Sequence, residues 1–327
     1  MKPSPDPTTI FRIARYYYET GLSQDEIAQR EGFSRSQVSR LVEKARAMGM
    51  VRIELVPPTG TVAEGYAARI EEAYGLGKVI VAPKGAAKNP DGASLARSIA
   101  TAAVDFIADA VRASAAVGIG WGRSVYSLAS QMPYYDPPGE RHFIPLLGTS
   151  GDDEPNLQIN TIVDRLSSRF RGHGHFVNTP AVREKVGART RIEEERIAVL
   201  RSLWNSVDMA IVGLGVPPNP ASRYLEEFPP AYREELYASG AVGDMLGQFF
   251  LADGTVVDFA EGYEHLAFDL SRLPSLDRVV CLAGGPDKAA GIAAAAKASY
   301  ITDLVTDEAT AEALCDGLDG ASRRQDR

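Results

Sequence analysis

Glycine-containing loops with cationic or hydroxyl side chains are the parts of this 327-residue chain best suited to chemistry. The first, residues 118–124, reads GIGWGRS. Its glycines allow a ligand to approach the backbone closely, and Arg123 and Ser124 can bond phosphate or hydroxyl oxygens. The spacing is GxGxG, which matches neither the dinucleotide-binding GxGxxG pattern nor the GxxxxGK phosphate loop. A tight turn without a ligand is the alternative interpretation.

Two further loops follow apolar runs and have similar composition. Residues 145–156 read PLLGTSGDDEPN, and residues 282–292 read LAGGPDKAAGI. Lys288 in the second of these lies in the first turn of an expected helix, where the helix dipole favours acidic side chains. A bound anion would resolve that conflict, and a solvated lysine is the alternative.

Signatures of catalysis or metal binding are scarce. The chain has no GxSxG and no HExxH motif. His142 and His265 belong to no helical pair, and His173 and His175 read more readily as strand-edge residues than as metal ligands. Asp244 could act as a base, but the sequence supplies no recognisable partner for it. No cofactor and no metal are therefore expected.

The elements around these loops alternate between strand and helix from residue 61 onward. Apolar runs predict strands at residues 78–82, 115–120, 141–147, 175–180, 208–215, 278–284 and 300–306. Helices fit between them, for example over residues 92–112 and 287–298. This alternation predicts a largely parallel α/β sheet covered by helices, interrupted by a strand–turn–strand element at residues 243–258. Ligands of such sheets bind at the carboxyl ends of strands, where the three loops lie.

The first 56 residues have a different pattern. Residues 8–21 have helical apolar spacing and end at a glycine, and Ser23 with Glu26 forms a capping box that begins a second short helix. Ser34 caps a third helix, whose inward face is Val38, Leu41, Val42 and Ala45. Two short helices joined by a glycine-containing turn predict a helix-turn-helix. The alternating strand at residues 51–56 would be a wing, in which Arg52 could contact phosphate.

The third helix has side chains suited to a DNA groove. Arginine can bond guanine, glutamine can bond adenine, and serines allow close approach to the backbone phosphates. The expected DNA-contacting residues are Ser34, Arg35, Ser36, Gln37, Ser39, Arg40 and Lys44. A three-helix dimerisation or scaffold module with a solvated polar face is the alternative.

Charge and composition agree with two domains. Residues 1–56 contain nine basic and seven acidic residues, whereas the whole chain has a net charge of -8. A weakly basic head on an acidic body is typical of a nucleic-acid-binding unit joined to a separate domain. The expected domains are residues 1–56 and 61–320, with a linker at 57–60 and a disordered tail at 321–327. Two cysteines without CxxC spacing and the lack of a signal peptide or membrane span favour the cytoplasm.

The order of these motifs resembles the SorC family of bacterial transcription regulators over essentially the whole chain. The most specific segment is residues 282–314, with its Gly-Gly pair, its lysine and the run LVTDEATA. The resemblance implies a winged helix-turn-helix domain and a Rossmann-like domain similar to glucosamine-phosphate deaminase and ribose-phosphate isomerase. That domain would bind a sugar, polyol or phosphosugar effector without catalysis, in a homotetramer or dimer of dimers that binds operator DNA.

The resemblance also implies which residues face the effector. They are Gly118, Gly120, Trp121, Gly122, Arg123, Ser124, Gly148, Thr149, Asp244 and Lys288. Thr149 departs from the family pattern, in which a second glycine often follows the PLLG glycine. Two other functions stay open: a sugar-phosphate isomerase or deaminase with a regulatory head, and a sugar-sensing adaptor whose head binds protein.

Overall fold

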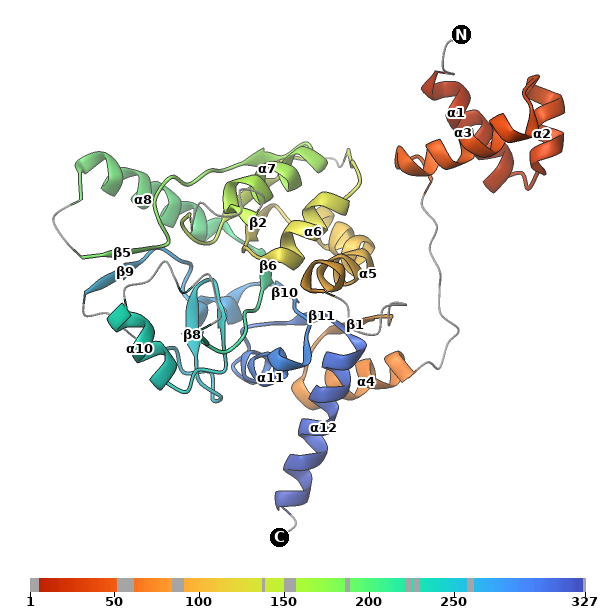
Figure 1. The fold of residues 1–327 in the computed structure, drawn as a ribbon. Helices are drawn as coiled ribbons and strands as arrows, with labels where there is room; N and C mark the ends of the chain where they lie inside the picture. Colours follow the sequence, from red (N-terminus) through yellow and green to blue (C-terminus); the bar gives the residue numbers. More distant parts are fainter. Residues whose placement is uncertain are drawn as a thin grey trace. The chain divides into compact units, whose positions relative to one another are not determined.

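The chain divides by its internal contacts into two compact units, residues 1–59 and 60–327. The computed structural model describes residues 6–51, 62–83, 91–136, 139–149, 157–185, 189–220, 225, 230–257 and 262–325, with side chains up to residue 319 (Figure 1). We call the smaller unit the head and the larger unit the body. The expected wing at residues 51–56, with Arg52, and the expected linker at 57–60 fall almost entirely outside the described residues.

The described part of the head, residues 6–51, forms three helices: α1 (Pro7–Tyr18), α2 (Gln24–Glu31) and α3 (Arg35–Ala47). Ser23 and Ser34 each form a complete capping box at the start of α2 and α3. Gly32 ends α2 with a φ of 70°, a backbone conformation that glycine adopts without strain. The apolar residues at helical spacing form one buried cluster, which includes Ile13 and Val38. The predicted three-helix pattern is thus confirmed.

The body contains a seven-stranded parallel sheet in the order β1-β11-β10-β6-β2-β3-β4. The strands are β1 (Lys78–Ala82), β2 (Ala116–Ile119), β3 (His142–Pro145), β4 (His173–Gly174), β6 (Met209–Gly213), β10 (Arg278–Leu282) and β11 (Asp303–Asp307). Near-continuous apolar runs such as MAIVG are buried on both faces, as parallel strands between helices must be.

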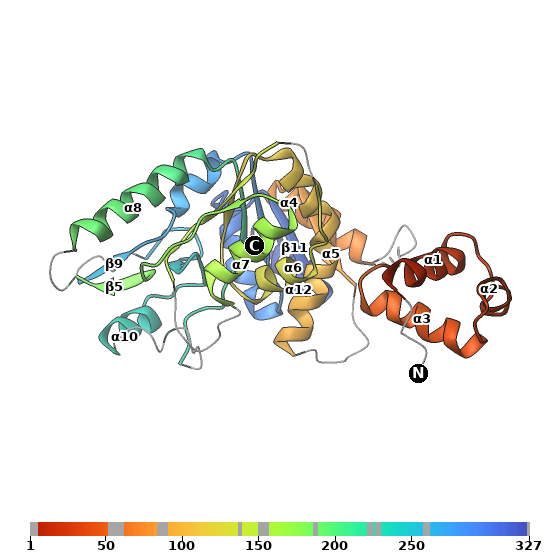
Figure 2. The same cartoon turned by 90° about the horizontal axis from the view of Figure 1, so that it is seen from above.

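Helices cover both faces of this sheet. They are α4 (Val62–Tyr74), α5 (Gly92–Ala113), α6 (Arg123–Gln131), α7 (Ile159–Arg169), α11 (Ala289–Lys297) and α12 (Glu308–Gln325). The body also contains α8 (Arg191–Leu203) and α10 (Pro230–Ala238). Figures 1 and 2 show α5, α6 and α7 grouped on one side of the sheet, and α4, α11 and α12 on the other. The body also has two short antiparallel ribbons, β5 (Val182–Glu184) with β9 (Tyr263–His265) and β7 (Gly243–Met245) with β8 (Gln248–Phe250). In the parts of the chain that are described, no helix has the length and apolar character to cross a membrane.

Three sequence predictions need correction. The strand expected at residues 175–180 is wrong: the edge strand is β4, and Asn160 binds both backbone groups of Val177 through its side-chain amide. These side-chain bonds take the place of the backbone hydrogen bonds that a neighbouring strand would provide. The helix expected at 287–298 is divided into the 3-10 turn η4 (Pro286–Lys288) and α11. Residues 321–325, expected to be disordered, continue α12.

Candidate functional site

The sheet has one topological switch point, between β2 and β6. From β2 the chain proceeds outward through β3 and β4, and from β6 it proceeds the other way through β10 and β11. In open α/β sheets, ligands bind outside the carboxyl ends of strands at such a point. The loops after β2, β3 and β10, which the sequence singled out, all leave this edge of the sheet.

The loop after β2 is held close to β6. The Gly120 amide donates to the Ile211 carbonyl over 2.8 Å, and a Cβ at Gly120 would lie only 3.1 to 3.3 Å from Leu246 and the β6 backbone. Gly122, with a φ of 117°, precedes α6 and supplies no side-chain cap. Among the described residues no side chain caps this helix start, so its first amides can bind a ligand.

The other residues of this loop differ in exposure. Trp121 and Ser124 are half-buried, and Arg123 is exposed with its Nη1 close to Gly92, the first residue of α5. Gly118 lies inside β2, where a Cβ would come within 2.7 Å of the Leu146 side chain. Gly118 therefore serves packing between β2 and the end of β3.

Asp244 is brought to the same end of the sheet by the β7–β8 hairpin. The turn of this hairpin has φ values of 54° at Leu246 and 73° at Gly247, and a leucine in that region is strained. The Gly247 amide donates a hydrogen bond to the Asp244 carboxylate. Burial raises the pKa of Asp244 to about 6, while Lys288 and the Gly247 amide act in the opposite direction.

Gly215, which follows β6, leaves the space that the Asp244 carboxylate occupies. A Cβ at position 215 would lie 1.8 Å from Asp244 Oδ1, and the Gly215 amide donates to the Asp244 carbonyl over 2.9 Å. A larger residue there would displace the Asp244 carboxylate. Gly215 is the last residue of the strand predicted at residues 208–215, and nothing in the sequence indicates this role.

Lys288 lies close enough to Asp244 for the two charges to interact. Burial lowers the pKa of Lys288, and the carboxylate of Asp244 is among the groups that oppose this shift, whereas Arg123 adds to it. The neighbouring Cys281 thiol is fully buried, and its pKa is raised to about 12, so it is not a nucleophile. The structure thus brings together three predicted residues that are far apart in sequence: Arg123, Asp244 and Lys288.

The loop that presents Lys288 is anchored by the LVTDEATA segment. Gly285, with a φ of 106°, donates its amide to Asp307 Oδ2 over 2.9 Å and to Thr310 Oγ1 over 2.7 Å. Asp307 also accepts the Thr310 hydroxyl and the first amides of α12. Asp307 and Thr310 therefore position the lysine loop, a role that sequence analysis missed because it depends on contacts between β10 and β11.

Gly148 and Thr149, which follow β3, connect the end of this strand to neighbouring segments through backbone hydrogen bonds. The Gly148 amide donates to the Leu266 carbonyl, and the backbone of Thr149 exchanges hydrogen bonds with Thr179 and Ala181 over 2.9 and 2.7 Å. A Cβ at Gly148 would lie 2.4 Å from the Thr179 carbonyl oxygen. The threonine side chain is half-buried at the same end of the sheet, and the loop continues into residues 150–156, which are not described.

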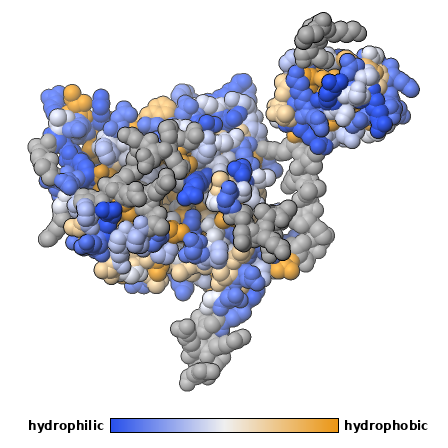
Figure 3. Space-filling view, viewed as in Figure 1, coloured by the Kyte–Doolittle hydropathy of each residue, from blue (hydrophilic) through white to orange (hydrophobic). Residues whose placement is uncertain are grey.

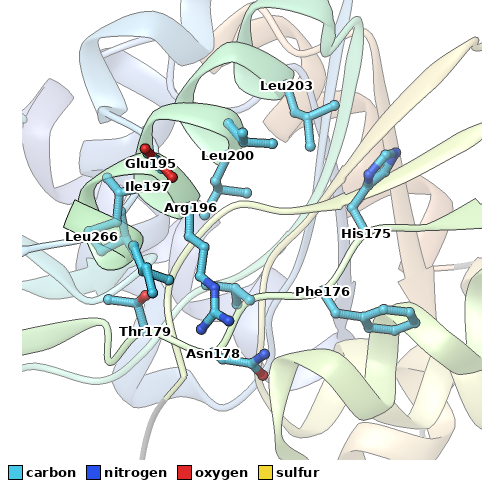
Figure 4. Close-up of a pocket in the computed structure, with 13 residues that line it drawn as sticks. His175, Phe176, Asn178, Thr179, Glu195, Arg196, Ile197, Leu200, Leu203 and Leu266 are labelled. Carbon is cyan, nitrogen blue, oxygen red and sulfur yellow. The ribbon is translucent and has the colours of Figure 1, made fainter. Parts of the chain in front are cut away.

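A separate groove of about 440 Å³ lies between α8 and residues 175–179 (Figure 4). Its lining is mainly apolar, with Ile197, Leu200 and Leu203 on α8 and Leu266 opposite, and Arg196 extends across it in Figure 4. None of the residues predicted to bind an effector lines this groove. In the described chain, no group of three or more His, Cys, Asp or Glu residues could hold a metal ion.

The predicted DNA-contacting residues lie along α3. Ser34, Arg35, Ser36, Gln37, Arg40 and Lys44 are exposed, and Ser39 is half-buried. Polar residues cover most of the visible face of the head in Figure 3. The Ser34 and Gln37 side chains form the capping box, so each is already oriented by the backbone. Arg35 pairs weakly with Asp25 at 3.7 Å, and Arg40 Nε donates to the Ser36 carbonyl.

Comparisons with known proteins agree with this architecture. A family model described as "Putative sugar-binding domain" matches residues 63–316. The sorbitol operon regulator of Klebsiella pneumoniae is 26% identical over 96% of this chain and 99% of its own length. The transcriptional regulator LsrR of Escherichia coli O139:H28 is 30% identical over 93% of both chains. The crystal structure of the full-length sorbitol operon regulator SorC from K. pneumoniae has a TM-score of 0.75 at 24% identity, covering 95% of this chain and 99% of that one.

These matches span both units, and they confirm the predicted fold class and the resemblance drawn from the motifs. The family model covers most of the body, including the loops after β2, β3 and β10. The relatives extend over the head as well. The chain belongs to the SorC family of transcriptional regulators and carries a sugar-binding domain in its larger unit.

Proposed function

We propose that a small carbohydrate or polyol with an anionic group, such as a phosphosugar, binds at the switch point of the body and controls how the head binds operator DNA. The observation that carries this proposal is that Asp244 and Lys288 are both half-buried and interact electrostatically, with Arg123 also close enough to act on Lys288. Charged groups are costly to bury unless a partner or ligand compensates them. A ligand that combines an anion with hydroxyl groups complements such a site.

Each side chain has a role in this scheme. Lys288 and Arg123 bind the anionic group, supported by the free amides at the start of α6. The Asp244 carboxylate accepts hydrogen bonds from hydroxyl groups. The Ser124 and Thr149 hydroxyls contribute further bonds at the rim.

In the head, α3 enters the major groove of operator DNA. Arg40 reads a base, while the exposed serines and Lys44 contact phosphates. The effector changes transcription by binding one arrangement of the oligomer more tightly than another, because a ligand shifts a conformational equilibrium only through such differential affinity. A homotetramer or dimer of dimers in the cytoplasm is part of this proposal.

Calorimetric titration of the full chain with sugars, polyols and their phosphates tests the effector site. One compound of this class should bind, and Lys288→Gln should weaken it at least about tenfold, the loss expected for a charge-assisted hydrogen bond. Lys297→Gln is the matched control, because Lys297 is exposed at the end of α11. Equal loss in both variants, or none in either, would remove Lys288 from the site.

An enzymatic function is the second candidate. Asp244 favours it specifically, since a carboxyl whose pKa is raised to about 6 is suited to general base catalysis near neutral pH. Turnover of ribose 5-phosphate or glucosamine 6-phosphate that disappears in Asp244→Asn would establish an isomerase or deaminase. We expect no turnover, because the relatives that the chain matches are named as regulators.

A further inference from the structure

One face of α8 carries exposed apolar side chains that no described element of the body covers. Ile192 and Val199 are 60% and 61% exposed, and both line the groove beside this helix. Phe176, on the opposite wall of the groove, is 57% exposed. Among the described residues of the body, half of the large exposed apolar side chains therefore gather at this one place. Figures 1 and 2 show α8 at the margin of the body, beside the β5–β9 ribbon.

The sequence of α8 makes this surface complementary to itself. Ile192 and Val199 are seven residues apart, so they lie two turns from each other on one face, separated by about 10 Å. Glu195 and Arg196 lie between them on the same face. If two copies of α8 pair antiparallel about a two-fold axis through the middle of this stretch, Ile192 faces Val199 and Glu195 faces Arg196 of the other copy.

The charges of this face are available for such pairing. Glu195 Oε1 accepts from Arg191 one turn earlier, and no other described residue is paired with its second oxygen. Within the described chain, Arg196 makes no ion pair. An interface related by a two-fold axis must carry both members of each complementary pair on one surface. A surface for a different partner would need no such internal symmetry.

We propose that the α8 face, defined as Ile192, Glu195, Arg196 and Val199, is a two-fold interface between copies of this chain. The apolar pairs contribute the burial, and the reciprocal Glu195–Arg196 pairs set the antiparallel register, as charged flanking positions do between paired helices. The groove walls around Phe176 widen the contact. This inference deepens the proposed oligomer by assigning one of its surfaces, and it requires neither DNA nor effector.

Sedimentation equilibrium of the full chain, without DNA or effector, tests this interface. Ile192→Glu/Val199→Glu should halve the mass of the wild-type assembly. Ala198→Glu is the matched control, because Ala198 is an exposed position of α8 outside the groove lining, and this variant should keep the wild-type mass. Far-UV circular dichroism shows that each variant is folded.

A charge exchange tests the register itself. Glu195→Arg alone places two arginines opposite each other across the axis and should weaken association at least about tenfold. Glu195→Arg/Arg196→Glu restores the complementary pairs and should recover most of the association. A monomeric wild type, an unchanged mass in the apolar variant, or a double exchange as weak as the single one would each overturn the proposal. All three results leave DNA binding and effector binding to be judged by their own titrations.

Discussion

The head and the body place their candidate functional residues in opposite environments. On α3 the predicted DNA contacts are mostly exposed, and their hydrogen bonds stay within the helix and its cap. In the body, Asp244 and Lys288 are half-buried, and burial displaces the pKa of both toward the neutral form. An exposed contact outside the cap, such as Arg40, can therefore be replaced with loss of DNA binding but little loss of stability. In the body, binding residues are retained at the expense of stability, as is common at ligand sites.

The largest expected effect is that of Asp244→Asn. The ordinary pKa of Asp244 is 3.8, and its pKa in the folded protein is about 6. At a pH between these two values, the folded protein binds a proton at Asp244 that the unfolded chain does not. Stability from this group is therefore present at low pH and is lost as the pH rises through 6. At pH 7.5 the amide variant should be more stable by up to about 3 kcal/mol, the equivalent of two pKa units.

Urea unfolding followed by tryptophan fluorescence measures this change, because both tryptophans, Trp121 and Trp204, belong to the body. The same variant should lose effector binding. A variant that is less stable at pH 7.5 and binds effector normally would contradict the assignment of Asp244 to the site.

Arg40→Ala should have the next largest effect, confined to DNA. If Arg40 reads a base, operator affinity should fall by about 1 to 3 kcal/mol while thermal stability is unchanged. Arg15→Ala, an exposed arginine on α1, is the comparison variant. Anisotropy with operator and with unrelated DNA measures both. Equal losses on both DNAs would make Arg40 a phosphate contact, and no loss would remove it from the interface.

Variants of the two capping boxes of the head should have smaller effects, and they distinguish a role in helix stability from a role in DNA binding. Ser23→Ala and Ser34→Ala should each destabilise the head by about 1 kcal/mol, the usual cost of losing an N-cap. Amide hydrogen exchange in α2 and α3 of the full chain measures this. Only Ser34→Ala should also weaken operator binding, since Ser34 begins the recognition helix. Equal operator affinity in the two variants would make Ser34 purely a cap.

His175→Gln should have the smallest effect, seen only as a pH dependence. Burial, followed by His142 and His173, lowers the pKa of His175 below its ordinary 6.5. The unfolded chain then binds more protons than the folded one as the pH falls below 6.5, so the wild type loses stability there. The variant should show a shallower decline between pH 7 and 5 in urea unfolding. A parallel decline would show that His175 does not contribute.

Periodicity and turn chemistry predicted most of the fold because they act locally. The capping boxes at Ser23 and Ser34, and the buried strands at β6 and β10, follow directly from residue order. The prediction of a strand at 175–180 is wrong because the composition of this segment suits a strand, whereas the side chain of Asn160 on α7 binds the Val177 backbone. Local pattern cannot predict such a tertiary bond.

The candidate site was predictable only in part for the same reason. Arg123 and Lys288 carry a local signal, because each lies in a glycine-containing loop before a helix. Gly215 and Thr310 carry none, since their roles depend on the β7–β8 hairpin and on the neighbouring strand. Strain at Leu246 likewise becomes visible only when the hairpin turn is seen.

One titration tests the link between the two units most directly. Fluorescence anisotropy of the full chain with DNA from its own promoter region is measured at two salt concentrations, with and without sugars, polyols and their phosphates. We predict sequence-selective binding that weakens steeply with salt, because phosphate contacts release counterions. One compound should change the affinity for this DNA, and Lys288→Gln should abolish that change. Absence of selective binding at both salts, or an affinity that no compound alters, would contradict an effector-controlled regulator and favour the enzyme or the protein-binding adaptor.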